Sequence, residues 1–210
     1  MTLRALALLL PASALTSVLC AASGAPPARP IDVHLGGPAL AEAVRLGVSG
    51  DEPALEGFHA RYRASLGGPL PGSLEIVSEY RRAVLSAQKA RRGGGTWDAA
   101  QAARALEPFR GLVTVVVNVH FNPKNTYRSL PQFDLVLYPQ DGGPRLEPVD
   151  QQATPSYLSG PAPPGTPILE GTVEAQFRAA SLDPGGKHLV GIFFEGREIE
   201  RIPVDFASMR

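Results

Sequence analysis

The sequence has a single cysteine, few histidines and no excess of charge of either sign. Lys and Arg together number 20 of the 210 residues, and so do Asp and Glu, so the formal net charge is zero. Binding to nucleic-acid phosphates needs a clustered excess of Lys and Arg, so this balance argues against a nucleic-acid partner. A lone cysteine cannot form an intramolecular disulfide, which excludes a disulfide-stapled fold.

Two signatures of hydrolysis are missing, and so are those of phosphate binding and metal binding. The chain contains no G-x-S-x-G and no H-E-x-x-H, the signatures of serine hydrolases and zinc peptidases. Its glycine-rich stretch, QKARRGGGTW at 88–97, lacks the Lys-Ser/Thr ending of a P-loop. No histidine has a second His or a Cys at ligand spacing; the four are His34, His59, His120 and His188. We therefore expect no metal and no cofactor.

The longest apolar run is too short to span a bilayer, which takes about 20 residues. It covers residues 5–19, follows the charged Arg4 and is followed within a few positions by the small residues AASGA. A charged start, a short apolar core and a small-residue exit predict an export signal over residues 1–25. A proline-rich linker is expected to follow over residues 26–38.

Cys20 has two alternative fates in this signal. In bacterial lipoproteins the chain is cut just before a cysteine that carries the lipid, which makes Cys20 a lipidation site. Leu19 departs from the small residue normally found there. A cut after Ala22 or Ala25 would instead discard Cys20. Both routes predict a mature protein that has no free thiol. We expect this protein in the periplasm, anchored to the outer membrane, or secreted. A lipid on Cys20 would be its only contact with a membrane.

Residues 39–110 carry apolar residues at helical spacing and predict a small helical region. One helix is expected over residues 49–66, with Ser49 or Asp51 as its cap and Leu55, Phe58, Tyr62 and Leu66 on its buried face. A second is expected over about 74–92. A third is expected from the cap Thr96 to near Pro108, and residues 39–46 form another helix or a turn.

From Gly111 onward the apolar period drops to two, which indicates strands. The alternation in LVTVVVNVHF, residues 112–121, places four valines and Phe121 on one face. Further strands are expected over about 133–138, 168–177, 188–194 and 198–206, with Ile168 pointing away from the core. Glu195-Gly196-Arg197 predicts a hairpin. Pro203 cannot donate to a ladder, so the last strand should be an edge strand or contain a bulge.

These patterns predict the α+β class, with a helical N-terminal region followed by an antiparallel immunoglobulin-like β-sandwich over residues 111–210. The strand pattern of residues 111–206 resembles the telokin-like domains of many exported bacterial proteins. That resemblance implies a binding or scaffolding module rather than an enzyme, although fold alone does not assign a function. The absence of a linker near Gly111 indicates that the helices and the sandwich pack together.

Two loops are the candidate binding sites, because sandwich architectures bind through the loops that join their strands. The loop 122–132 carries Lys124, Tyr127 and Arg128, and a proline-rich loop at 154–167 carries Tyr157. Tyr and Arg are residue types that interfaces favour. The expected partner is an envelope protein or a glycan.

Two alternatives stay open. The first is an envelope enzyme, such as a hydrolase, with a site in the helical region. Its residues would be Glu75, Glu79, Tyr80, Arg81 and Arg82. The second is an accessory subunit whose helices dock on a larger envelope complex.

Overall fold

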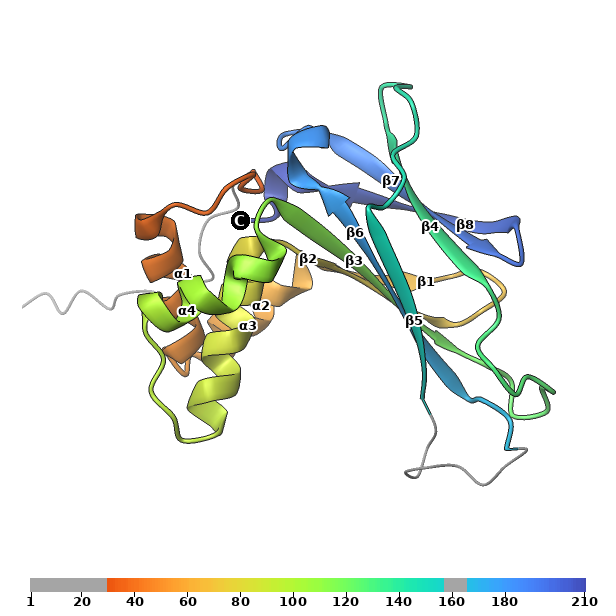
Figure 1. Ribbon diagram of the computed structural model, residues 1–210, viewed down its shortest axis with the longest axis horizontal. Coiled ribbons are helices and arrows are strands. Elements are labelled where there is room, and N and C mark those ends of the chain that lie inside the picture. Colours follow the sequence, from red (N-terminus) through yellow and green to blue (C-terminus); the bar gives the residue numbers. More distant parts are fainter. Residues whose placement is uncertain (1–29, 157–165) are drawn as a thin grey trace, which may run out of the picture.

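The computed structural model describes residues 30–156 and 166–210 (Figure 1). Within these ranges the chain forms four α-helices and two antiparallel sheets, which confirms the α+β class. The helices are α1 (Gly37–Val48), α2 (Glu52–Ala60), α3 (Glu79–Arg92) and α4 (Ala99–Leu106). The strands are β1 (Arg63–Leu66), β2 (Gly72–Val77), β3 (Leu112–His120), β4 (Phe133–Pro139), β5 (Asp150–Ser156), β6 (Glu170–Arg178), β7 (Lys187–Phe194) and β8 (Arg197–Asp205).

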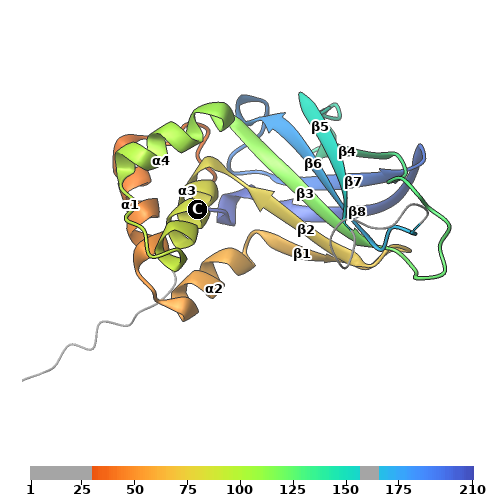
Figure 2. The ribbon, with the colours of Figure 1, turned by 60° about the horizontal axis from the view of Figure 1, so that its bottom comes forward.

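The larger sheet has the strand order β1-β2-β3-β6-β5, and the smaller sheet has the order β4-β7-β8. The helices gather at one end of the strands, and the loops of the opposite end project away from them (Figures 1 and 2). Apolar side chains from the helices and from both sheets form one hydrophobic core. The helical part and the strands therefore pack together, as the missing linker near Gly111 indicated.

The central strand of the larger sheet, β3, carries the most regular pattern in the sequence. Its alternate residues Val113, Val115, Val117 and Val119 are at most 1 % exposed. These are the residues that the alternation of apolar side chains predicted on the buried face of the strand. The edge position of β8 and the tight Glu195-Gly196 hairpin that precedes it are confirmed as well.

Two polar side chains bridge the sheets where their edge strands face each other. On one side, Gln151 of β5 donates from Nε2 to the Phe133 carbonyl oxygen at 2.6 Å and accepts at Oε1 from the Leu135 N–H at 3.0 Å. On the other side, the Glu200 carboxylate of β8 accepts from the backbone N–H groups that follow β1, Gly67 at 2.8 Å and Gly68 at 3.1 Å. The first bridge satisfies backbone groups of the edge strand β4 that would otherwise be free to pair with another chain, and the second satisfies two N–H groups of the turn after β1.

The helix predicted over 49–66 ends at Ala60, and residues 63–66 form β1 instead. A spacing of four residues between Tyr62 and Leu66 fits a strand as well as a helix, because four is a multiple of the strand period of two. The structure buries both residues and leaves Ala64 between them half-buried. Pairing with β2 across the Gly67–Pro71 turn decides in favour of the strand.

The helix predicted over 74–92 is also too long, since α3 begins only at Glu79. Leu74 and Ile76 lie on β2 and are buried on one face of the larger sheet. Ser78 is the N-cap of α3, and its hydroxyl oxygen accepts from the Arg81 N–H at 3.2 Å. Two strands thus interrupt the segment 39–110, and the expectation that strands occur only after Gly111 was wrong.

Three smaller expectations need correction. The N-cap of α4 is Asp98 rather than Thr96, because Asp98 forms a reciprocal capping box with Gln101. Strand β5 was not predicted, since its sequence DQQATPS has no apolar alternation for a period to reveal. Ile168 is buried instead of pointing away from the core.

The described part of the predicted linker 26–38 is packed onto the body of the protein. Ile31 is 3 % exposed and its N–H donates to the Phe206 carbonyl oxygen at 2.9 Å. Leu35 is 5 % exposed, and α1 begins two residues later. Apolar residues among the prolines therefore make residues 31–38 part of the fold rather than a spacer.

Glu79, the first residue of α3, joins three segments that are distant in sequence. Its side chain is only 1 % exposed. One carboxylate oxygen accepts from the Gly111 N–H at 2.6 Å, and the other accepts from the Leu35 N–H and from the Arg110 guanidinium, each at 3.2 Å. This buried carboxylate therefore ties the N-terminal segment and the start of β3 to the helix.

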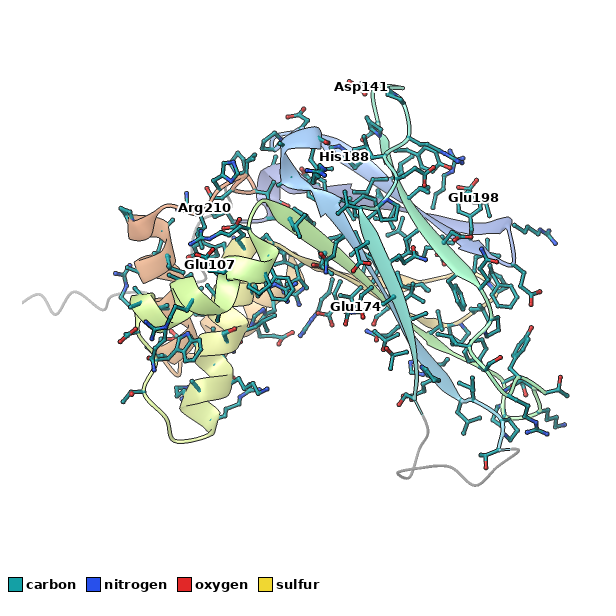
Figure 3. All side chains as sticks on the ribbon, viewed as in Figure 1. Glu107, Asp141, Glu174, His188, Glu198 and Arg210 are labelled. Atoms are coloured by element: carbon teal, nitrogen blue, oxygen red, sulfur yellow. The ribbon has the colours of Figure 1, made fainter. Side chains whose placement is uncertain are left out.

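We expect Glu79→Ala to lower the free energy of unfolding by about 3–5 kcal/mol, because it leaves buried donors and a cation without their partner. Glu107→Ala is the matched control. Glu107 also pairs with Arg110, at 3.8 Å, but its side chain is 70 % exposed (Figure 3). Its removal should change the unfolding free energy by less than about 0.5 kcal/mol. Urea unfolding of both variants measures the difference, and equal losses would contradict the role given to Glu79.

Candidate functional site

The loop 122–132, predicted to bind, connects β3 to β4 at the end of the sheets away from the helices (Figure 1). The hairpin between β7 and β8 lies at the same end. A backbone hydrogen bond joins the two, from the Glu195 N–H to the Gln132 carbonyl oxygen at 2.9 Å. The loop and the hairpin thus form one continuous surface.

Two asparagines fix the shape of the loop. Asn122 Oδ1 accepts from the Lys124 N–H at 2.8 Å, and Asn125 Oδ1 accepts from the Tyr127 N–H at 2.9 Å. Asn125 also donates from Nδ2 to the Ile168 carbonyl oxygen at 2.8 Å, which ties the loop to the segment before β6. Such side-chain turns pre-organise a loop, so a ligand that binds it does not have to order it first.

Tyr127 anchors the loop to an aromatic cluster at the end of the core. Its ring lies 5.6 Å from that of Phe121 and 6.2 Å from that of Phe194, both in edge-on orientations. Phe133 contacts the same two rings, at 6.4 Å and 5.2 Å. Tyr127 and Phe194 are each half-buried, so they support the loop and also present part of their rings to solvent.

Three exposed cations lie on the same loop and hairpin as these rings. Lys124 and Arg128 belong to the loop, and Arg197 is the cross-strand neighbour of Phe194 in the hairpin. None of the three forms an ion pair with a residue that the structure describes. We call Lys124, Tyr127, Arg128, Phe194 and Arg197 the loop-end surface. The sequence missed Phe194 and Arg197, because only the hairpin brings them to the loop.

Two residues singled out in the sequence, Cys20 and Tyr157, lie outside the described residues. Tyr157 follows β5, whose last residue Ser156 pairs with Glu170 of β6, and Glu170 pairs with His120 at the end of β3. The chain therefore leaves β5 at the end of the larger sheet from which the loop 122–132 also departs.

The residues proposed for an enzymatic site in the helical region divide into separate networks. Arg81 is fully buried and donates to the Ile76 carbonyl oxygen at 2.6 Å and to Glu75 Oε2 at 2.5 Å. Its guanidinium also lies 5.1 Å from the centre of the Tyr62 ring. Burial lowers the pKa of Arg81, an effect that the Glu75 carboxylate opposes. These contacts are those of an ion pair packed between α3 and the larger sheet.

The other members of the set have different partners. Arg82 donates to Thr114 Oγ1 at 2.9 Å and lies 3.6 Å from the centre of the Phe109 ring. Tyr80 is 1 % exposed, and burial raises its pKa to about 12. With Glu79 engaged by backbone N–H groups, the structure brings together only Glu75 and Arg81 of this set. Glu75, Arg81 and Arg82 make their contacts at the junction of α3 and the larger sheet, whereas the Tyr80 ring packs 5.8 Å from that of Phe58 in α2.

One pattern associated with acyl transfer does occur in the chain. Ser86-Ala87-Gln88-Lys89 matches S-x-x-K and lies in the second half of α3. A nucleophile of this kind needs its base within hydrogen-bond reach. Ser86 is half-buried, Lys89 is exposed, and no hydrogen bond between their side chains is found in the described structure. The pattern therefore gives no support to a nucleophilic site.

The histidines lie in different environments. In the described ranges, no group of three His, Cys, Asp or Glu side chains is arranged to hold a metal ion. His59 is 5 % exposed, and its Nε2 lies 2.8 Å from Gln88 Oε1. His188 is 2 % exposed and packs against Phe206 with ring centres 4.8 Å apart. His34 and His120 are exposed.

No helix in residues 30–156 or 166–210 is long and apolar enough to cross a membrane. Compared with protein-family models, with curated proteins and with solved structures, the chain matches none of them.

Acidification should destabilise the fold through the two buried histidines. Burial lowers the pKa of both His59 and His188 from 6.5. The unfolded chain then binds more protons than the folded one, so their contribution to stability is complete above pH 6.5 and is lost as the pH falls below it. We expect the free energy of urea unfolding to be lower at about pH 5.5 than at about pH 7.5.

His59→Gln should reduce this pH dependence, because glutamine stays uncharged on acidification while it can still bond to Gln88. His34→Gln at the exposed position is the control and should retain the dependence of the parent protein. If His59→Gln shows the same loss of stability as the parent between the two pH values, the assignment to His59 is wrong.

Proposed function

We propose that the chain is an exported, non-enzymatic module of the bacterial envelope, with an immunoglobulin-type β-sandwich that binds an anionic glycan through the loop-end surface. The observation that carries the proposal is the loop-end surface itself. It combines a pre-organised loop, two half-exposed aromatic rings and three cations without ion pairs to described residues.

The strand order supports an immunoglobulin-type sandwich. Constant-type immunoglobulin domains have strands A, B, E and D in one sheet, in the order ABED, and strands C, F and G in the other. If β2 to β8 are lettered A to G along the chain, the larger sheet contains ABED and the smaller sheet contains CFG. Strand β1 then adds to the outside of strand A, and α3 with α4 is an insertion between strands A and B.

This lettering also gives the loop-end surface its place in the architecture. The loop 122–132 becomes the B–C loop, and the β7–β8 hairpin becomes the F–G loop. In variable immunoglobulin domains these two loops lie at the end that binds the antigen. The topology thus supports the sequence-based choice of Lys124, Tyr127 and Arg128 as binding residues.

The chemistry of the surface favours an anionic glycan as ligand. Lys124, Arg128 and Arg197 can each donate charge-assisted hydrogen bonds to carboxylate, sulfate or phosphate groups, and arginine can do so with two parallel bonds. The half-exposed rings of Tyr127 and Phe194 offer apolar faces on which a sugar ring can stack. A polymer of uronic acids presents both features, a carboxylate and a ring face, at every residue.

We expect the parent protein to bind polygalacturonate, with an affinity that falls as salt is added, and not to bind neutral dextran. Lys124→Glu combined with Arg128→Glu should weaken the binding at least about tenfold, because it reverses two charges at the surface. Isothermal titration calorimetry measures both affinities. The unfolding free energy should stay within about 0.5 kcal/mol of the parent value, because both residues are exposed.

Lys89→Glu combined with Arg104→Glu makes the same change of net charge on α3 and α4. Both residues are exposed, and this control variant should bind polygalacturonate like the parent. If both double variants bind polygalacturonate equally weakly, the weakening is caused by the change in net charge and not by the loop-end surface. Parent-like binding by the Lys124 and Arg128 variant would overturn the proposed surface.

Export makes a separate prediction about the N-terminus. Expressed at full length in a bacterial host, the mature protein should begin at Ser23 or Pro26, or at a Cys20 that carries a diacylglycerol-sized addition. Intact-mass spectrometry of the envelope fraction distinguishes these starts. A protein that retains Met1 and stays in the cytoplasm would contradict export, whatever the glycan experiment shows.

A further inference from the structure

The turn that follows β4 contains the one Asp-Gly sequence of the chain, Asp141-Gly142, and the chain has no Asn-Gly sequence. In such a pair the backbone nitrogen of the glycine can attack the side-chain carboxyl carbon of the aspartate and close a succinimide ring. The reaction needs a carboxyl group that lies close to the following peptide and a nitrogen that neighbouring atoms do not shield. Figure 3 shows Asp141 at the tip of this turn, away from the body of the protein.

The fold requires glycine at position 142 and leaves its nitrogen accessible. Gly142 has a φ of +87°, a backbone conformation that glycine adopts without strain and other residues avoid. A Cβ atom built on Gly142 would meet no described atom within 4 Å, so the space around this backbone is open. Its N–H donates to the Pro139 carbonyl oxygen at 3.3 Å, which is longer than the usual distance of about 2.9–3.0 Å. The geometry that demands glycine in this turn therefore also leaves its nitrogen unshielded.

The Asp141 side chain already lies beside the peptide whose nitrogen would attack it. Asp141 Oδ1 accepts from the Gly143 N–H at 3.3 Å, and this hydrogen bond holds the carboxyl group next to the Gly142 backbone. Holding two reacting groups close together favours their reaction. Asp141, Gly142 and Gly143 are all exposed, so water can reach the turn and hydrolyse the ring.

Other aspartates in turns lack such a nucleophile. Asp183 Oδ1 accepts a similar hydrogen bond, from the Gly185 N–H at 3.0 Å, but the next residue is Pro184, whose nitrogen carries no hydrogen. Asp205 is followed by Phe206, which is fully buried. Among the described aspartates, only Asp141 combines a side chain folded toward the backbone with a glycine as the next residue.

We propose that Asp141 is a modification site at which isoaspartate forms spontaneously. The Gly142 nitrogen bonds to the side-chain carboxyl carbon of Asp141, and its hydrogen leaves with a carboxyl hydroxyl group as water. Water then opens the succinimide at either of its two carbonyl groups. Attack at the main-chain carbonyl breaks the bond to the Gly142 nitrogen and leaves the backbone running through the side chain, which is isoaspartate. One water is released and one is consumed, so neither the mass nor the redox state of the protein changes.

The experiment ages the purified protein in neutral buffer at physiological temperature and maps its peptides over several weeks. Trypsin releases residues 129–145 as one peptide, because Arg128 and Arg145 flank it without an internal Lys or Arg. This peptide also contains Asp134, which lies in β4 and is followed by Leu135, so it carries its own control. We expect a second form of the peptide with equal mass to accumulate, with isoaspartate assigned to position 141 by electron-transfer fragmentation and Asp134 unchanged.

The variant Asp141→Glu keeps the negative charge but would have to close a larger ring, so it should not form the second peptide. The synthetic peptide 129–145 measures the rate without the fold. The folded protein should react within about tenfold of this rate, because an exposed turn opens at little cost.

The proposal is overturned if the aged protein contains no isoaspartate at position 141, or if Asp141→Glu forms the second peptide as fast as the parent. It is also overturned if the folded protein reacts more than about tenfold more slowly than the synthetic peptide, because the fold would then protect the turn. The outcome is independent of glycan binding, since Asp141 lies beyond the end of β4 opposite to the loop-end surface.

Discussion

The buried carboxylate of Glu79 is the contact on which the arrangement of helices and sheets depends. A carboxylate can be buried at low cost only if donors surround it. Here they come from Leu35, Arg110 and Gly111, which belong to the N-terminal segment and to the start of β3. Because Glu79 is also the first residue of α3, its charge interacts favourably with the N-terminal end of the helix dipole. One side chain thus fixes where α3 meets the central strand.

A few polar side chains also determine how the two sheets are joined. Their inner faces share an apolar core, but such burial is not directional and does not by itself set how the edges align. Gln151 and Glu200 supply that direction, since each accepts or donates at defined backbone atoms of the facing sheet. Backbone groups at the start of β4 and in the turn after β1 are therefore satisfied from within the chain.

The two ends of the smaller sheet differ in charge. Exposed cations share the loop and the hairpin with Tyr127 and Phe194 at one end, whereas the exposed Asp141 and Asp183 lie at the other. A chain with a net charge of zero can therefore still present two surfaces of opposite charge. The first of these is the surface proposed to bind an anionic glycan.

The sequence by itself determined the α+β class, the inward face of β3 and the hairpin at Glu195-Gly196, and it limited the last strand to an edge position or a bulge. These features follow from local rules, since a period of two, a proline without an N–H and a turn glycine act through neighbouring residues alone. The sequence also indicated the loop of Lys124, Tyr127 and Arg128 as a candidate site. It did not indicate that the hairpin residues Phe194 and Arg197 belong to the same surface. The tertiary structure decided that residues 63–66 and 72–77 are strands, that the polar β5 joins the larger sheet, and that Glu79 and Arg81 are buried structural groups. Those outcomes depend on pairing with β3 and β6 and on burial by distant segments, which no window of neighbouring residues contains.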